Sequence, residues 1–530
     1  MPDKRVRLFR VFRVFRGLNS YSIDKRWLKT GLLLIIMPFA GISFMYAQSP
    51  APADGVAREA FQQLRIYQVM VAAFIDGDSS RNFDAGYGPS HHHGDLKGVI
   101  RALPYIKSLG MNAVWLTPIF DSSGGGSDDP RLDATGYFPR NYFRIDPRFG
   151  SLEDARELVD TAHSLGLYVL FDGVFGHHKG EVPASPGGHQ PVGPAKQVAY
   201  PASLAFYREV ATYWIDELGI DGWRLDQAYQ VPPEAWQEIR GAVEATCRER
   251  RTAGESWGVL GYMVAEIWDG EQAISPQAYG SAETPALYSA FDFPLRYRLV
   301  QTLAAEESGM RRLDAATLEE GYRTHGIYPP HAIPNLMLTN HDLVRFGDLI
   351  ERAGLPGKDH PDYWKRHRCA FSFMAANSGP LTIYYGDEYG EEVPGFAAKV
   401  SDRCWEVQRC DDHVSRTSGR IDGFSKEEQS LQAYLRELMQ LREAHPALWK
   451  GARRNLRGEG SIYADEKSFQ DERIIYIMNI ADEAATAEFA VDELNATLLK
   501  DLLSGRKWPE ENGRFRIEME GLSAAFLLVE

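Results

Sequence analysis

Residues 219–230 read GIDGWRLDQAYQ, a short strand pattern that runs into the carboxylate of Asp226. On both sides of it, further β-branched or aromatic runs alternate with helix-compatible stretches, which is typical of parallel βαβ units. The predicted strands are 67–74, 113–117, 168–174, 222–226, 263–268, 287–291, 335–339 and 381–385. Eight such units predict an α/β fold, a closed (β/α)8 TIM barrel.

Two segments interrupt the alternation, and a third pattern follows it. Residues 179–201 are rich in Pro and Gly and predict a short inserted loop over the barrel mouth, and residues 121–147, with three consecutive glycines, predict a flexible rim. After a helix predicted over 431–445, alternating runs indicate strands and a small antiparallel β-sandwich domain. We therefore predict a catalytic barrel over 56–445 and a C-terminal β domain over 446–530.

The composition limits the partners and the redox chemistry. The 530 residues carry a formal net charge of −15, which argues against nucleic acid because phosphate binding needs clustered Lys and Arg. The four cysteines are too few for a disulfide scaffold. Cys404 and Cys410 could close one loop in an oxidising compartment or remain free thiols.

The N-terminus is the one basic region. Nine Lys and Arg residues between Lys4 and Lys29 precede an apolar run over 31–47, which is shorter than the roughly 20 residues of a membrane-spanning helix. This predicts a signal peptide over 1–47 and a periplasmic or extracellular protein. The long basic leader and the bulky Met45 leave an uncleaved anchor as the alternative, so we expect membrane contact only through this segment.

Acidic residues stand at the carboxyl ends of four predicted strands: Asp172, Asp226, Glu266 and Asp342. One such residue is more often a turn or a helix cap, but in a barrel four of them converge on one mouth. Glycoside hydrolysis needs a carboxylate pair, in which one group attacks the anomeric carbon and the other protonates the leaving oxygen. Arg224, two residues before Asp226, would keep that carboxylate ionised, and apolar neighbours would raise the pKa of Glu266.

These motifs resemble the α-amylase family, glycoside hydrolase family thirteen, and the resemblance covers nearly the whole chain after the N-terminal segment. It rests on FDGVFGHH, GIDGWRLD, AEIW and TNHD, together with the segment that contains Tyr137. The resemblance implies a retaining α-glycosidase acting on maltooligosaccharides or α-glucans, without an organic cofactor. It implies Asp226 as nucleophile, Glu266 as acid/base and Asp342 as the third catalytic carboxylate, with Tyr137, Asp172, His177, Arg224 and His341 binding substrate.

Departures from the family pattern concern metal binding and specificity. Gly176 stands where the first motif commonly has the Asn that binds a calcium ion. Gln227 to Gln230 replace the Lys and His that many endo-acting amylases use beyond the cleavage point, so linkage and endo or exo action stay open. Near the first strand, IDGDSSRNFD resembles the calcium loop of cyclodextrin-processing relatives. It predicts calcium ligands at Asp76, Asp78, Asn82 and Asp95, with a solvated turn as the alternative.

Three functions fit these residues. The first is a hydrolase, and the second is a transglycosylase or isomerase that uses the same glycosyl-enzyme intermediate. The third is a membrane-anchored, catalytically silent amylase-like partner protein. The intact carboxylates argue against the third, and the sequence alone does not separate the first two.

Overall fold

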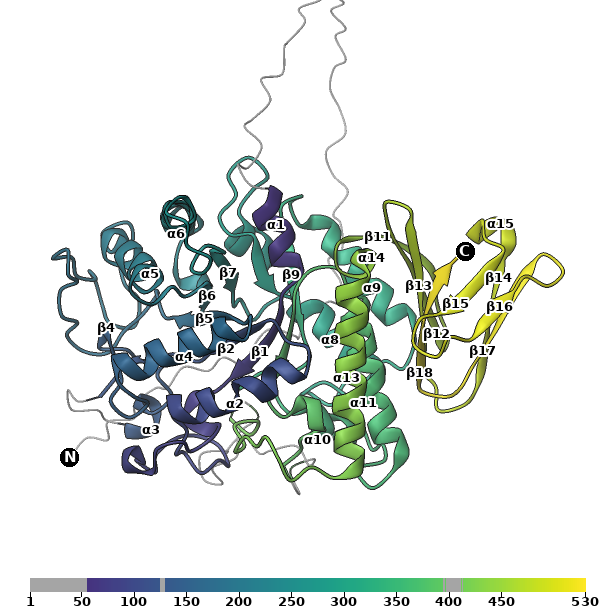
Figure 1. Cartoon of the computed structure of the whole chain (residues 1–530), viewed down its shortest axis with the longest axis horizontal. Helices are drawn as coiled ribbons and strands as arrows, with labels where there is room; N and C mark the ends of the chain where they lie inside the picture. Colours follow the sequence, from purple (N-terminus) through teal and green to yellow (C-terminus); the bar gives the residue numbers. More distant parts are fainter. Residues whose placement is uncertain (1–54, 124–128, 394–395, 397–410, 412) are drawn as a thin grey trace, which may run out of the picture. The chain divides into compact units, whose positions relative to one another are not determined.

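The computed structural model describes residues 55–123, 129–393, 396, 411 and 413–530 (Figure 1). The predicted N-terminal signal segment, Cys404 and Cys410 lie outside these residues, so those predictions stand as they were. Within the described part of the chain, no helix combines the length and the apolar character needed to cross a membrane. Cys247 and Cys369 are buried free thiols.

The predicted barrel is confirmed. Eight parallel strands close into a ring in the order β1-β10-β9-β8-β7-β6-β5-β2, and β1 pairs with both β2 and β10. The strands are β1 (Arg65–Val69), β2 (Ala113–Leu116), β5 (Tyr168–Gly173), β6 (Gly222–Leu225), β7 (Tyr262–Ala265), β8 (Ser289–Phe291), β9 (Ile333–Met337) and β10 (Leu381–Tyr384).

Helices follow most of the strands and form the outer layer (Figure 1). Their starts carry sequence signals: the Asp95 side chain caps α2, and Ser151 and Asp154 form a capping box at α4. Between β7 and β8 there is only one turn of α-helix followed by a π-helical turn. The elements are α1 (Gly55–Gln62), α2 (Leu96–Ser108), α4 (Leu152–Ser164), α5 (Leu204–Leu218), α6 (Pro233–Thr252), α7 (Glu271–Ile274), α8 (Phe293–Leu303), α9 (Ala316–Thr324), α10 (Phe346–Arg352), α11 (Pro361–Ala376) and α13 (Lys426–Ala444).

The barrel interior is a packed core. Trp115, Tyr262, Phe291 and Met337 come from four different strands and are all at most 1% exposed. A filled interior leaves the carboxyl ends of the strands as the place where polar side chains can meet substrate.

Two sequence expectations need correction. The first strand ends at Val69, because residues 71–73 turn into a short 3₁₀ helix; these residues are buried, so their apolar pattern looked like more strand. The predicted flexible rim over 121–147 has secondary structure. Strand β3 (Phe120–Asp121) pairs with β4 (Asn141–Ile145), and the short helix α3 (Pro130–Asp133) lies between them in the chain. The rim's three glycines lie outside the described residues, whereas the loop over 179–201 has neither helix nor strand, as expected.

The predicted C-terminal β domain is also confirmed as a set of antiparallel sheets. A short helix, α14 (Pro446–Lys450), follows α13, and a six-stranded sheet has the order β11-β12-β13-β18-β15-β16, with β14 and β17 forming a second sheet. The two sheets share an apolar core that includes Ile475, Phe489 and Phe515. The strands are β11 (Ala452–Glu459), β12 (Ile462–Phe469), β13 (Glu472–Asn479), β14 (Ala485–Ala490), β15 (Leu498–Asp501), β16 (Lys507–Pro509), β17 (Arg514–Met519) and β18 (Ser523–Val529), with the one-turn helix α15 (Val491–Leu494) after β14.

Candidate active site

The backbone places the candidate carboxylates with little freedom. Asp226 and Glu266 each stand one residue beyond the end of a strand, and their N–H groups still donate to neighbouring strands, at Gly173 O (3.0 Å) and Leu225 O (2.9 Å). In the register, Asp172 lies beside Arg224 and Leu225 lies beside Ala265. The barrel therefore presents these side chains from adjacent strands at one end.

Arg224 gathers three of the carboxylates. Its Nη1 contacts Asp172 Oδ1 and Asp226 Oδ1, each at 2.9 Å, and its Nη2 lies 2.7 Å from Glu266 Oε1. The guanidinium is 1% exposed and lies over the rings of Trp115 and Tyr137. A buried cation shared by three anions compensates part of the cost of removing them from water.

Asp172 is fully buried and serves as a hub for polar contacts. Besides Arg224, it accepts hydrogen bonds from Tyr137 Oη (2.8 Å) and Trp115 Nε1 (3.1 Å). Burial raises its pKa to about 7, against the opposing charge of Arg224. Its position suits a group that orients neighbours rather than one that reacts.

The two carboxylates beyond β6 and β7 differ in their surroundings. Burial, opposed by Arg224 and reinforced by the charges of Asp226 and Asp342, raises the pKa of Glu266 to about 8. This is the expected direction; of the neighbouring apolar residues, Ile267 is buried and Trp268 is 44% exposed. Asp226 Oδ1 is held by Arg224, while its buried Oδ2 has no hydrogen-bond partner among the described residues.

His341 and Asp342 follow β9 on a tight turn. The side chain of Asn340 accepts hydrogen bonds from the N–H groups of Asp342 (2.8 Å) and Leu343 (3.0 Å), which fixes the turn. Burial lowers the pKa of His341 to about 3, so its ring is neutral near pH 7. Burial would raise the pKa of Asp342, but the neighbouring His341 ring and the charges of Arg416 and Arg224 lower it to about 2.

The remaining predicted binding residues join the same cluster. The Tyr137 ring is stacked on His341, with centroids 5.2 Å apart and planes 6° apart. His177 Nε2 lies 3.9 Å from Asp226 Oδ2 and 3.0 Å from Tyr137 O. All eight predicted catalytic and binding residues thus lie together at the mouth.

Three further members were missed. Gln68, at the end of β1, places Nε2 2.8 Å from His341 Nδ1, and Trp115 bonds Asp172 from β2. Arg416, in the loop after β10, donates to Asp342 Oδ1 (2.7 Å) and to His341 O (3.0 Å). A polar residue ending an apolar strand could have pointed to Gln68, but no pattern in the sequence marks Arg416.

The predicted calcium ligands contact one another and neighbouring protein groups. Asp95 accepts from the N–H groups of Gly77 and Asp78, and Asp78 is paired with Arg81 at 3.0 Å. Asn82 Nδ2 donates to Asp76 Oδ2 (3.0 Å). Across the described residues, no three His, Cys, Asp or Glu side chains are grouped to hold a metal ion. Calcium binding by these residues stays a prediction.

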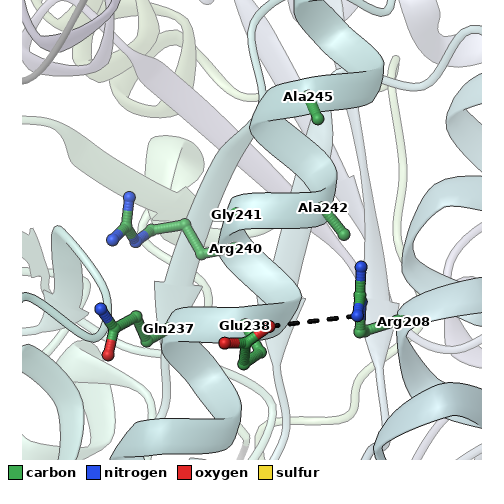
Figure 2. Close-up of a pocket in the computed structure, with 7 residues that line it drawn as sticks. All are labelled: Arg208, Gln237, Glu238, Arg240, Gly241, Ala242 and Ala245. Atoms are coloured by element: carbon green, nitrogen blue, oxygen red, sulfur yellow. Dashed lines mark ion pairs between the residues drawn. The ribbon is translucent and has the colours of Figure 1, made fainter.

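A separate shallow cavity of about 350 Å³ lies on the outer surface. Figure 2 shows its lining on α6, where Glu238 faces Arg208 across 4.0 Å. None of the predicted site residues lines it, so it is not part of the chemistry at the barrel mouth.

Comparison with known proteins agrees with this geometry. Residues 68–185 and 203–422 match the sequence model of the alpha amylase catalytic domain. The chain belongs to the α-amylase family. The resemblance seen in the sequence is thereby confirmed, and this α-amylase-family chain is a glycoside hydrolase.

Similar proteins include named amylolytic enzymes. Neopullulanase 2 of Thermoactinomyces vulgaris is 26% identical to this α-amylase-family chain, over 91% of this chain and 80% of its own length. A cyclomaltodextrinase of Thermoanaerobacter pseudethanolicus is 27% identical, over 78% and 69% of the two chains. Crystal structures of AmyP, in complex with maltose and, for a variant, with maltotriose, are 50% identical, with a TM-score of 0.88. The AmyP variant is matched over 90% of this chain and 99% of its own.

Proposed function

We propose that the chain hydrolyses α-glucosidic bonds in maltooligosaccharides and related α-glucans with retention of anomeric configuration. The state of Asp226 carries the proposal. One of its oxygens is oriented by Arg224, and the other is buried and without a hydrogen-bond partner among the described residues. An oriented carboxylate with one unengaged oxygen is what attack on an anomeric carbon needs.

The reaction follows in two balanced steps. Asp226 Oδ2 attacks C1 of the bound sugar while the C1–O bond to the leaving sugar breaks, and Glu266 gives its proton to the leaving oxygen. A water molecule then attacks C1, the bond to Asp226 breaks, and the water proton passes to Glu266. The raised pKa of Glu266, about 8, keeps the acid protonated at neutral pH for the first step.

The spacing of the pair supports retention. Asp226 and Glu266 contact the two terminal nitrogens of one guanidinium, so their carboxyl groups lie close together. Retaining glycosidases hold the pair about 5 Å apart, and inverting enzymes leave more room for a water molecule between them.

The remaining mouth residues are proposed to hold the sugar at the cleavage point. Near pH 7 Asp342 is ionised and His341 is neutral. Asp342 can therefore accept hydrogen bonds from sugar hydroxyls, and the His341 ring can donate one. Tyr137 offers a ring face beside His341. The maltose and maltotriose named for the AmyP complexes support α-glucosidic oligosaccharides as the substrate class.

The silent-partner alternative is disfavoured because Asp226, Glu266 and Asp342 are all present and converge at one end of the barrel. Transfer to a sugar instead of water uses the same intermediate. We further propose export to the periplasm or the exterior, on the basis of residues 1–47. N-terminal sequencing of protein recovered from each cell fraction tests it.

The deciding experiment compares wild type with Asp226→Asn on maltoheptaose, β-cyclodextrin, isomaltose, trehalose and sucrose. Asp160→Asn, which changes an exposed carboxylate on α4, is the matched control. We expect wild type and the control to release α-anomers first, as read by NMR, and Asp226→Asn to release none. Initial β-anomers would refute the retaining mechanism, and no product from any substrate would refute the glucan assignment.

A further inference from the structure

Gln68 lies near the end of β1, and the proposed mechanism gives it no role. Its side chain is fully buried, and its amide Nε2 lies 2.8 Å from His341 Nδ1. In the parallel ladder Gln68 stands beside Trp115, which donates to Asp172. Two neighbouring strands thus support the mouth from within the barrel, one through a histidine and the other through a carboxylate.

Other groups also hold the ring of His341. Tyr137 stacks on it, with centroids 5.2 Å and planes 6° apart, and Trp115 meets it edge-on at 6.2 Å. On the other side of the ring, Nε2 lies 3.3 Å from Asp342 Oδ2. The aromatic contacts fix where the ring lies, but an imidazole turned by 180° has nearly the same shape. The polar contacts at its two nitrogens therefore decide which way it points.

These contacts also place the proton of the ring. Burial lowers the pKa of His341 to about 3, so the ring carries a single proton near pH 7. The pKa of Asp342, about 2, leaves that carboxylate ionised, and an ionised carboxylate only accepts hydrogen bonds. The proton therefore lies on Nε2, facing Asp342, and Nδ1 is left as an acceptor. The amide NH₂ of Gln68 is the donor within reach of Nδ1.

The amide of Gln68 loses other hydrogen bonds by taking this orientation. Its Oε1 is buried and has no hydrogen-bond partner among the described residues. The reverse orientation would bring Oε1 against the lone pair of His341 Nδ1, so that two acceptors would face each other. A buried polar atom without a partner costs stability, and such costs are typical of functional sites. The contact with His341 is thus maintained at the expense of the amide oxygen.

The second histidine of the mouth has the opposite contact. His177 Nδ1 lies 2.8 Å from Gln230 Oε1, while Gln230 Nε2 donates to Gln227 Oε1 (3.0 Å). Gly176 makes room for this arrangement, because a Cβ there would lie 2.3 Å from Gln230 Oε1. A glutamine supports each histidine, but Gln68 presents its nitrogen and Gln230 its oxygen. The two rings are therefore supported in opposite senses.

We propose that Gln68 is a positioning residue for the reaction: its amide N–H holds His341 Nδ1, so that the N–H at Nε2 is fixed beside Asp342 and faces the bound sugar. The inference rests on the proposed function. A neutral ring held in this way donates from a fixed point to a sugar hydroxyl, and such contacts strengthen as the sugar distorts toward the transition state. Without the donor at Nδ1, the ring can turn over or move its proton to the other nitrogen. The donor at Nε2 then loses its place.

The kinetic test compares wild type, Gln68→Met and Gln301→Met on maltotriose. Methionine keeps the length of glutamine but has no donor. Gln301 on α8 is the matched control, because it is also buried and its Nε2 donates to Glu306 (2.6 Å), which is not part of the site. We expect Gln68→Met to lower kcat about 10- to 100-fold and to leave KM within about 3-fold, because positioning matters most in the transition state. Gln301→Met should leave both within about 2-fold.

Nitrogen NMR of protein labelled with ¹⁵N-histidine gives a readout that a purely structural role would not move. The two signals of the His341 ring are identified by their absence from the His341→Asn spectrum. In wild type we expect an unprotonated, hydrogen-bonded Nδ1 and a protonated Nε2. In Gln68→Met the Nδ1 signal should move to the position of a nitrogen without a hydrogen bond. The wild-type spectrum tests the tautomer even where the variant does not fold.

The outcomes separate the inference from the proposed function. A protonated Nδ1 in wild type would overturn the inference. So would an unmoved Nδ1 signal in Gln68→Met, a kcat of that variant within about 2-fold of wild type, or an equal loss of kcat in Gln301→Met. Failure of wild type to hydrolyse maltotriose would instead refute the proposed function, while the spectrum would still report the hydrogen bond to His341.

Discussion

Arg224→Met removes the cation that Asp172, Asp226 and Glu266 share, while keeping an apolar side chain of similar length. Breaking one buried ion pair costs about 3–5 kcal/mol because it leaves an uncompensated buried charge. Three carboxylates lose their partner here, and each side chain is at most 8% exposed. We therefore expect the free energy of unfolding to fall by about 3–5 kcal/mol near pH 8.

The loss should depend on pH, and the sign follows from the carboxyl groups. Asp172 and Glu266 have pKa values of about 7 and 8 in the folded protein, above their ordinary values, although Arg224 lowers both. Without Arg224 these pKa values rise further, so the folded variant binds more protons than the unfolded chain. Wild type keeps both groups protonated below about pH 7, so the stability of the variant relative to wild type falls as pH rises through about 7 and 8.

Urea unfolding at pH 5 and pH 8, followed by tryptophan fluorescence, measures both effects. Arg208→Met is the matched control, because Arg208 and Glu238 are an exposed pair 4.0 Å apart and should contribute no more than about 1 kcal/mol at either pH. A loss for Arg224→Met below 1 kcal/mol, or one of equal size at the two pH values, would refute the view that one buried cation compensates three carboxylates.

Three further predictions concern the mouth and the loop after β1. The alkaline limb of kcat/KM for maltotriose should fall as pH rises through about 8, where Glu266 loses its proton. In Glu266→Gln this limb should vanish, with activity about 10²- to 10⁴-fold lower, and a limb that persists would assign it to another group. Gly176→Asn should displace Gln230 and lower maltotriose turnover, whereas Gly176→Asn combined with Gln230→Gly should recover part of it; no recovery would place the damage elsewhere. Removing calcium with EDTA should leave the thermal midpoint unchanged, because Arg81 already pairs with Asp78, and a drop of several degrees that calcium restores would confirm the predicted site.

The sequence predicted the site residues best where the ends of the barrel strands determine their position. Asp172, Asp226 and Glu266 could be assigned to one cluster because parallel strands in a barrel all end at the same side. Arg416 could not be predicted, because it reaches Asp342 from a loop without periodicity, and such a contact depends on three-dimensional placement alone. Calcium binding stays a prediction: the oxygen donors stand in the right order, and backbone N–H groups and Arg81 engage Asp95 and Asp78.

The absent Cβ at Gly176 also constrains how this protein can change over generations. Gln230 fills the space that any larger residue at position 176 would need, and it is itself held by Gln227 and His177. A lineage that acquires Asn at 176 must therefore first shorten residue 230, since the reverse order passes through a damaged intermediate. The two positions are expected to be exchanged as a pair, and substitutions that are harmless in one descendant will be harmful in another.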